Sequence, residues 1–147
     1  MKDRQTTFDR IRALVRGIQF AMLTTESPGG LRSRPMTTLS TDEDGDLWFF
    51  VSLRSDVAME VSQNPHVNLA YSEPDEKKFV SITGRAMIVL DADRKKALWN
   101  PMARAWFGGP EDPDLGLIKV SVREAEYWDG VTNQMVSLFE PAMAGVH

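Results

Sequence analysis

Apolar residues recur every three or four positions in the first segment of the chain, and polar residues fall mostly between them. The recurring apolar residues are Phe8, Ile11, Leu14, Val15 and Ile18. This spacing predicts an amphipathic helix whose apolar side packs on a core. Thr6 or Thr7 is placed to cap its start.

Shorter apolar segments bounded by turn residues follow, and they predict six strands. We expect strands at residues 20–25, from residue 31 onward, and at 46–52, 66–72, 79–90 and 117–122. Turn sequences at 27–30 and 42–45 and a charged turn at 73–78 separate them. In the second strand, alternation places Arg32, Arg34 and Met36 on one face.

Two helices are expected between these strands. Ser55 is placed to cap a short helix that Asn64 and Pro65 end. A second helix follows a cap at Asp91 or Asp93, and its interior Pro101 is expected to kink or split it. Gly84 indicates a bulge within the strand at 79–90. Residues 131–139 fit a helix and a strand equally well.

Strands joined mainly by tight turns favour an antiparallel barrel decorated with helices over a βαβ sheet. The predicted fold class is therefore mainly β, a six-stranded antiparallel split barrel. The 147 residues contain no repeat and no low-complexity linker, so we expect one domain over residues 1–147.

Composition narrows the function further. Cysteine is absent, which excludes disulfides, thiolate metal sites and cysteine nucleophiles, so any redox chemistry requires a bound cofactor. A formal net charge of -4 argues against a general nucleic-acid binder. With no long apolar segment and no secretory pattern at the N-terminus, we expect a soluble cytoplasmic protein that does not bind membranes.

Arginines provide the candidate phosphate site, because no glycine-rich nucleotide loop follows any predicted strand. Arg32, Arg34 and Arg54 lie on or just after strands that a hairpin at 42–45 would pair, and Ser55 begins a helix beside them. Arginine side chains and helix N-termini commonly bind phosphate. Ordinary surface charge is the alternative for Arg32 and Arg54, and Asp56 would compete with a phosphate at the helix end.

Several segments together resemble the general stress protein branch of the pyridoxamine 5′-phosphate oxidase-like FMN-binding split barrels. The similarity extends from the first helix to about Gly130. The segments that carry it are Arg32-Ser33-Arg34-Pro35-Met36, Trp48 to Ser55, Asn64 to Tyr71, Trp99-Asn100-Pro101, Trp106-Phe107, Asp112-Pro113 and Glu126-Tyr127-Trp128-Asp129.

The resemblance implies a homodimer with FMN at the subunit interface, and it assigns a role to each matching position. Arg34, Pro35 and Met36 would run along the flavin ring and ribityl chain, with Arg34 also near the phosphate. Phe50, Val51 and Ser52 would form the opposite wall, while Arg54 and Ser55 would bind the phosphate. Arg32 is a further candidate cation. FAD or the deazaflavin F420 is a less favoured cofactor.

The tryptophans are weighed separately, because tryptophan in a small protein usually lies in the core or at an interface. Trp106 is the first candidate for a flavin contact and is expected to come from the partner subunit. Trp128 is the second candidate.

The resemblance leaves the activity open. The C-terminal residues 140–147 lack the Arg-Leu-x-Pro type segment of true pyridoxamine phosphate oxidases, which disfavours vitamin B6 oxidation. His66 and His147 do not form a metal site. We therefore expect a flavin-dependent oxidoreductase that uses a reduced nicotinamide and a small acceptor. The alternatives are a non-catalytic flavin-binding stress or storage protein, an F420-dependent reductase and an unliganded structural dimer.

Overall fold

The structure is a computed structural model, and it describes residues 2–42 and 44–139. Within these residues it has eight strands: β1 (Phe20–Ser27), β2 (Gly30–Thr37), β3 (Ser40–Thr41), β4 (Leu47–Ser52), β5 (His66–Glu73), β6 (Lys78–Val89), β7 (Leu115–Asp129) and β8 (Gln134–Phe139). The helices are α1 (Lys2–Val15), α2 (Asp56–Gln63) and α3 (Ala92–Leu98), with short 3₁₀ helices η1 (Pro74–Glu76) and η2 (Pro101–Ala105). No helix in this part of the chain is long and apolar enough to cross a membrane.

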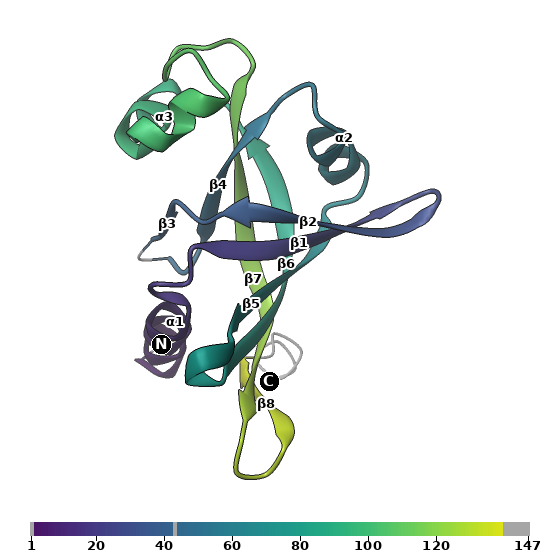
Figure 1. The fold of residues 1–147 in the computed structure, drawn as a ribbon, viewed down its shortest axis with the longest axis vertical. Helices are drawn as coiled ribbons and strands as arrows, with labels where there is room; N and C mark the ends of the chain where they lie inside the picture. Colours follow the sequence, from purple (N-terminus) through teal and green to yellow (C-terminus); the bar gives the residue numbers. More distant parts are fainter. Residues whose placement is uncertain (1, 43, 140–147) are drawn as a thin grey trace.

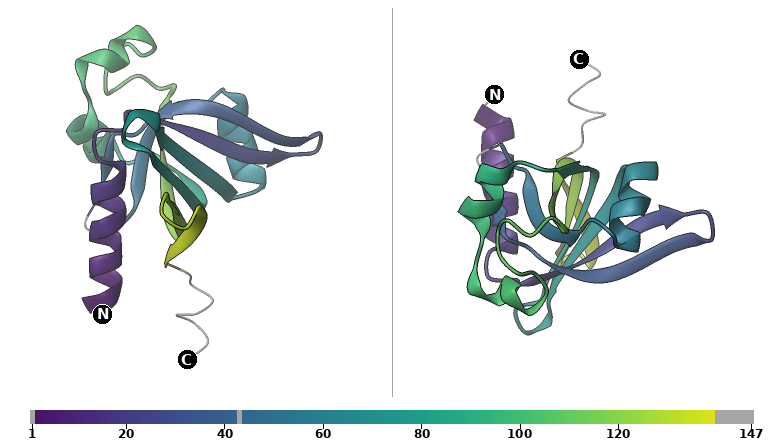
Figure 2. Two further views of the ribbon diagram at one scale, coloured as in Figure 1. Left: turned by 60° about the horizontal axis from the view of Figure 1, so that its bottom comes forward. Right: turned by 90° about the horizontal axis from the view of Figure 1, so that it is seen from above.

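All the strands belong to one antiparallel sheet. The strand order is β2-β1-β5-β6-β7-β4-β3, and β8 pairs with β7. Figure 1 shows the sheet curling so that β2 and β1 cross in front of β4 and β7. Figure 2 shows α1 and α2 on different sides of this curled sheet, while α3 and η2 lie beyond the end of β4. The expected mainly β split-barrel class is confirmed, with eight strands in place of six.

The core lies inside the curl. Alternate residues of the strands point into it, as in β1, where Ala21, Leu23 and Thr25 are fully buried and their neighbours are not. From α1, Phe8 and Ile11 pack into the same cluster. The helical spacing noted in the sequence therefore identified the buried side of α1 correctly.

The larger differences between the element boundaries and the sequence expectation concern α1, β7 and β8. Helix α1 begins at Lys2, so Thr6 and Thr7 lie inside it, because the preceding Lys, Arg and Gln residues favour helix. Strand β7 extends from Leu115 to Asp129, since it has paired neighbours along its whole length. Residues 134–139, which the sequence left undecided, form β8 against it.

The expected hairpin at 42–45 pairs different strands from those predicted. It joins β3 to β4, whereas β2 pairs with β1 across the turn at Pro28 and Gly29. Strand β4 pairs with β7 on its other side. Arg34 and Arg54 therefore do not lie on hydrogen-bonded neighbours, which the local turn signal alone could not reveal.

Three other local predictions are confirmed. The pairing of β6 with β7 shifts register between Thr83 and Gly84, which places the bulge at the expected glycine. Asp91 caps α3 by accepting from the amides of Asp93 and Arg94. Pro101 separates α3 from η2.

We predict that Gly84→Ala destabilises the fold. A Cβ at this position would lie 2.5 Å from the backbone oxygen of Ser121, which belongs to the paired strand and cannot move independently. Overpacking of this kind costs about 1–3 kcal/mol. Urea unfolding measures the loss. Gly29→Ala is the control, because a Cβ there meets no atom within 4 Å, and equal losses in both variants would contradict the close-packing argument.

Candidate functional site

A cleft of about 600 Å³ opens where the start of β1, the end of β2, the end of β4 and the η2 segment meet. Its volume falls within the range of about 300–1,000 Å³ that is usual for ligand sites. The lining residues are Gln19, Phe20, Pro35, Met36, Thr37, Thr38, Leu39, Phe50, Val51, Ser52, Ser55, Val57, Asn100, Met102, Ala103, Trp106, Phe107 and Asp114.

Aromatic and apolar side chains form most of the cleft wall. The ring of Phe50 lies 6.0 Å from that of Trp99 and 6.4 Å from that of Phe107, so the segment after α3 packs against β4. Trp106 is 76% exposed and lines the cleft of its own chain. A large exposed aromatic beside an apolar cleft is a typical contact for a planar ligand.

Polar groups of the cleft are held by neighbours from distant strands. The hydroxyl of Thr38 lies 2.8 Å from that of Tyr71, which is on β5. Burial raises the pKa of Tyr71 to about 12, so its hydroxyl stays protonated at neutral pH. Ser55 donates to the carbonyl of Ser52 and accepts from the amide of Ala58, which confirms it as the cap of α2.

Asp114 is the charged residue of the cleft. It accepts from the Ser52 hydroxyl at 2.5 Å and from the Arg54 Nε at 3.1 Å. The Ser52 hydrogen bond, with Arg54 adding to it, holds the pKa of Asp114 below its ordinary value. Among the described residues that line the cleft, Asp114 alone carries a charge at neutral pH.

Arg32 and Arg34 are bound to a different carboxylate, that of Glu60 on α2. Glu60 is only 5% exposed, and it accepts from the Thr25 hydroxyl at 2.6 Å. Arg34 Nη2 lies 2.8 Å and Arg32 Nη1 2.9 Å from its two oxygens. Arg32 also reaches Asp56 at 3.4 Å. This cluster fastens α2 to the hairpin of β1 and β2.

The structure therefore brings together most, but not all, of the residues selected from the sequence. Those that line the cleft are Pro35, Met36, Phe50, Val51, Ser52, Ser55 and Trp106. Arg54 is bound to a cleft residue, although it is not itself part of the lining. Arg32 and Arg34 face Glu60, and Trp128 lies on β7 opposite Met135 of β8, at the other end of the molecule from α3.

Sequence reasoning missed several lining residues. Asp114 and Phe107 come from the loop after η2, which reaches the cleft only because β7 pairs with β4. Asn100 had a usable local signal, since an asparagine before a proline is a typical helix cap, and its side chain accepts from the Met102 amide.

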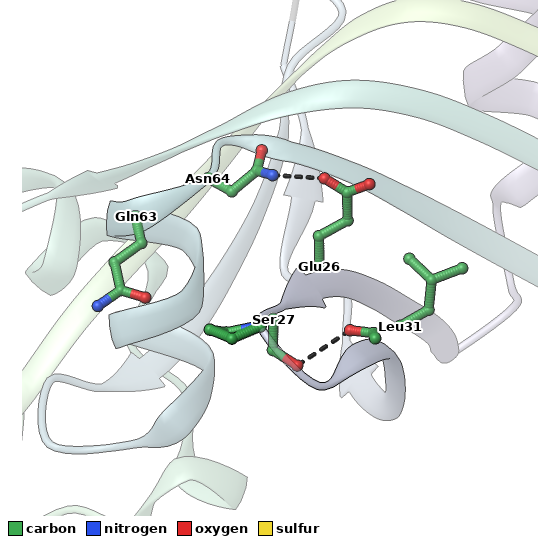
Figure 3. A pocket seen from close by; sticks show the side chains of 7 residues that line it. Glu26, Ser27, Leu31, Gln63 and Asn64 are labelled. Carbon is green, nitrogen blue, oxygen red and sulfur yellow. Dashed lines mark hydrogen bonds between the residues drawn. The ribbon is translucent and has the colours of Figure 1, made fainter.

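A second, smaller pocket of about 400 Å³ lies between the β1–β2 turn and the end of α2. Figure 3 shows Asn64 donating to Glu26 across it and Ser27 bonded to the turn. It contains none of the residues predicted for the site.

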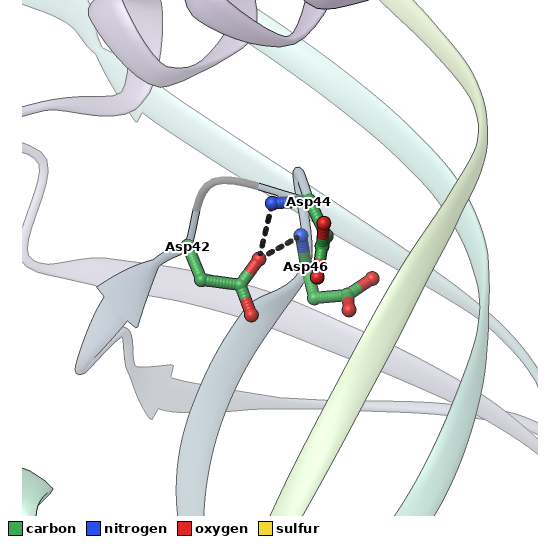
Figure 4. Close-up of side chains that lie close together, drawn as sticks. All are labelled: Asp42, Asp44 and Asp46. Carbon is green, nitrogen blue, oxygen red and sulfur yellow. Dashed lines mark hydrogen bonds between the residues drawn. The ribbon is translucent and has the colours of Figure 1, made fainter.

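Three aspartates gather at the β3–β4 turn (Figure 4). One oxygen of Asp42 accepts from the amides of Asp44 and Asp46, and the other accepts from Trp48 Nε1 at 2.9 Å. Hydrogen bonds from an aspartate side chain to the backbone amides that follow it are typical of a turn and need no bound metal. Asp42 thus serves to hold the hairpin and the buried Trp48.

Comparison with known proteins identifies the family. The family model for proteins described as pyridoxamine 5′-phosphate oxidase like matches residues 6–147. The chain belongs to this pyridoxamine 5′-phosphate oxidase-like family. The resemblance noted in the sequence is therefore confirmed.

Individual proteins that are similar to this chain in sequence or structure support the same family assignment. Protein bli-3 of Neurospora crassa is 33% identical over 74% of this chain, which spans 58% of the length of that relative. General stress protein 26 of Bacillus subtilis is 28% identical over 79% of this chain and 84% of its own. The crystal structure of the general stress FMN/FAD binding protein of Xanthomonas citri superimposes with a TM-score of 0.72 at 28% identity, covering 91% of this chain and 92% of that one.

We predict that Glu60→Gln makes stability less dependent on pH in the acid range. The hydrogen bond from Thr25, together with Arg34 and Arg32, lowers the folded-state pKa of Glu60 from 4.5. Its stabilising contribution is therefore complete above that value and is lost as the pH falls through the lower, folded-state pKa. The free energy of unfolding, measured by urea at pH 3.5 and 6, should fall more in the wild type than in the variant. An identical fall in both proteins would contradict the assignment.

Proposed function

We propose that the cleft binds FMN and that the protein is a flavin-dependent oxidoreductase. The observation that carries this proposal is the composition of the cleft, which combines aromatic walls from β4 and from Trp106 and Phe107 after η2 with hydroxyl and amide groups from β2 and the loops. A flavin ring needs an apolar slot with polar groups along one edge. Membership of a family with an FMN/FAD binding relative supports the choice of cofactor.

The residues fit the two ends of FMN unequally. Pro35, Met36 and Phe50 offer the ring apolar contacts, and Trp106 can cover its exposed side. For the phosphate, Ser55 opens α2 and Arg54 precedes it, so an amide-rich helix end and a cation lie together. Arg34 would reach a phosphate only by exchanging its bonds to Glu60 and Thr25.

A second copy of the chain would complete the site. The outer face of β1, β2, β5 and β6 carries charged side chains only at one end, where Glu26 and Arg85 lie, and the rest of this face is uncharged. Phe20 is 55%, Met22 42% and Phe79 37% exposed on it. Exposed apolar faces of this kind mark interaction surfaces. Phe20 and Pro35 belong both to this face and to the cleft, so a copy seated here would close over a bound ring.

The chain's own residues bind and orient rather than transfer protons. Asp114 has a lowered pKa and stays ionised, and Tyr71 has a raised pKa and stays protonated, so neither titrates near neutral pH. Bound flavin would supply the redox chemistry by accepting hydride from a reduced nicotinamide and passing electrons to a small acceptor. The aromatic and apolar walls of the cleft would exclude water from the ring, while Arg54 and Ser55 would hold the phosphate.

The cofactor proposal is tested by the absorption spectrum of the purified protein and by titration with FMN and with F420. We expect a yellow protein that prefers FMN and oxidises NADH or NADPH faster than free FMN does. A preference for F420 would overturn the cofactor assignment. Tight FMN binding without turnover would leave a flavin-binding protein and remove the oxidoreductase activity.

Trp106→Ala should weaken FMN binding by about 0.5–1.5 kcal/mol, because an aromatic contact with the ring is lost. Isothermal titration calorimetry measures the change, and circular dichroism checks that the variant folds. Trp128→Ala is the matched comparison, since Trp128 lies outside the cleft of its own chain. Weaker binding in Trp128→Ala alone would contradict the contact with Trp106. It would instead place the flavin against Trp128, at the end of β7 that pairs with β8.

Met22→Glu should convert a dimer to a monomer, because it buries a charge in the proposed interface. Light scattering after size-exclusion chromatography should give twice the chain mass for the wild type and the single chain mass for the variant. Met59→Glu is the control, since Met59 is 53% exposed on α2 and not on the sheet face. A monomeric wild type would contradict the shared site.

A further inference from the structure

The proposed phosphate end of the cleft is almost electrically neutral, which is unusual for a site that takes an anion. Asp114 is ionised there, and Arg54, which binds it, sits just outside the lining. Asp56, in the first turn of α2, adds a second carboxylate, which Arg32 pairs at 3.4 Å. A phosphate entering beside Ser55 would therefore meet balanced charges, and not an excess of cations.

The geometry shows how Asp114 and Arg54 are coupled. One oxygen of Asp114 accepts from both the backbone amide and the Nε of Arg54, at 3.3 and 3.1 Å. The other oxygen accepts from Ser52, so the carboxylate is held at three points and cannot turn away. The Arg54 side chain is 87% exposed, and its contact with Asp114 is made by Nε and not by the two terminal nitrogens of the guanidinium group.

We propose that Asp114 sets how strongly the cleft distinguishes a phosphorylated flavin from an unphosphorylated one. Its carboxylate offsets part of the charge of Arg54 and repels the phosphate, so the phosphate adds less to the affinity for FMN than Arg54 and the start of α2 would give without Asp114. This inference rests on the proposed flavin site. It makes Asp114 a specificity-determining residue that acts on the phosphate end and leaves the ring contacts unchanged.

The physical basis is the sign and distance of the charges. A phosphate ester carries about -1.5 to -2 charges at neutral pH, and like charges at a protein surface repel over several ångströms. Neutralising Asp114 leaves Arg54 with an uncompensated positive charge beside Ser55. The ribityl chain and ring of riboflavin carry no charge, so their binding does not respond to this change.

The experiment compares the dissociation constants of FMN and riboflavin in the wild type and in Asp114→Asn at low salt. We expect the ratio of riboflavin to FMN dissociation constants to rise about fivefold in the variant, as a surface charge change predicts. Raising the salt concentration should reduce this gain, because the phosphate is screened. The exposed Asp75→Asn on η1, which removes the same charge from a residue outside the cleft lining, should leave the ratio unchanged.

Arg54→Gln and the double variant with Asp114→Asn form the other half of the test. Arg54→Gln should lower the ratio, and the gain from Asp114→Asn should be smaller when Arg54 is absent, because the two side chains act on each other. Because Arg54 is exposed, we expect Arg54→Gln to fold normally. Its effect on the ratio can therefore be measured even if Asp114→Asn destabilises the loop.

The outcomes separate the two proposals. If the wild type binds both flavins but Asp114→Asn leaves the ratio unchanged or lowers it, the role of Asp114 is wrong and the flavin site remains. If neither flavin binds to the wild type or to any variant, the proposed function fails, and the role of Asp114 fails with it. If Asp75→Asn raised the ratio as much as Asp114→Asn does, the effect would come from the net charge of the protein. This result would overturn the role proposed for Asp114.

Discussion

The pairing of β7 with both β4 and β6 is the constraint on which the site depends. Strand β4 meets β7 from Leu47 to Ser52, and β6 meets it along most of its other edge. Because Ser52 lies opposite Leu115, the residue before Leu115 is placed beside the end of β4. That residue is Asp114, which is how a carboxylate 62 positions away comes to accept from Ser52.

Curvature of the sheet then forms the cleft. The bulge at Gly84 allows β6 to cross β7 at a close approach that no side chain would permit. The sheet thereby curls until the end of β2 faces β4, although the two strands share no ladder. Met36 and Phe50 consequently face one cleft from strands that are not hydrogen-bonded neighbours.

The buried carboxylate of Glu60 explains why the arginines of β2 are not all available to a ligand. A carboxylate that is 5% exposed requires paired cations and hydrogen bonds, and Arg34, Arg32 and Thr25 provide them. Arg54 does not pair with this buried carboxylate, and its partner is Asp114 at the edge of the cleft. Glu60 on α2 therefore decides that Arg32 and Arg34 are held by an ion pair within the protein, while Arg54 pairs with Asp114 beside the cleft.

Local sequence signals were sufficient for elements whose stability is local. The amphipathic face of α1, the cap at Ser55, the bulge at Gly84 and the break at Pro101 all depend on residues close together in the chain. The motifs also led to the family, and through it to seven residues of the cleft.

What the sequence could not reveal is which distant groups meet. Pairing of β4 with β7, capture of Arg34 by Glu60 and the place of Asp114 in the cleft follow from strand order and burial. The sequence by itself thus determined the mainly β class, the local caps and turns and the supply of arginines. Only the tertiary structure decided which arginine stays near the cleft, because a buried carboxylate must be neutralised by whichever cations the folded chain brings to it.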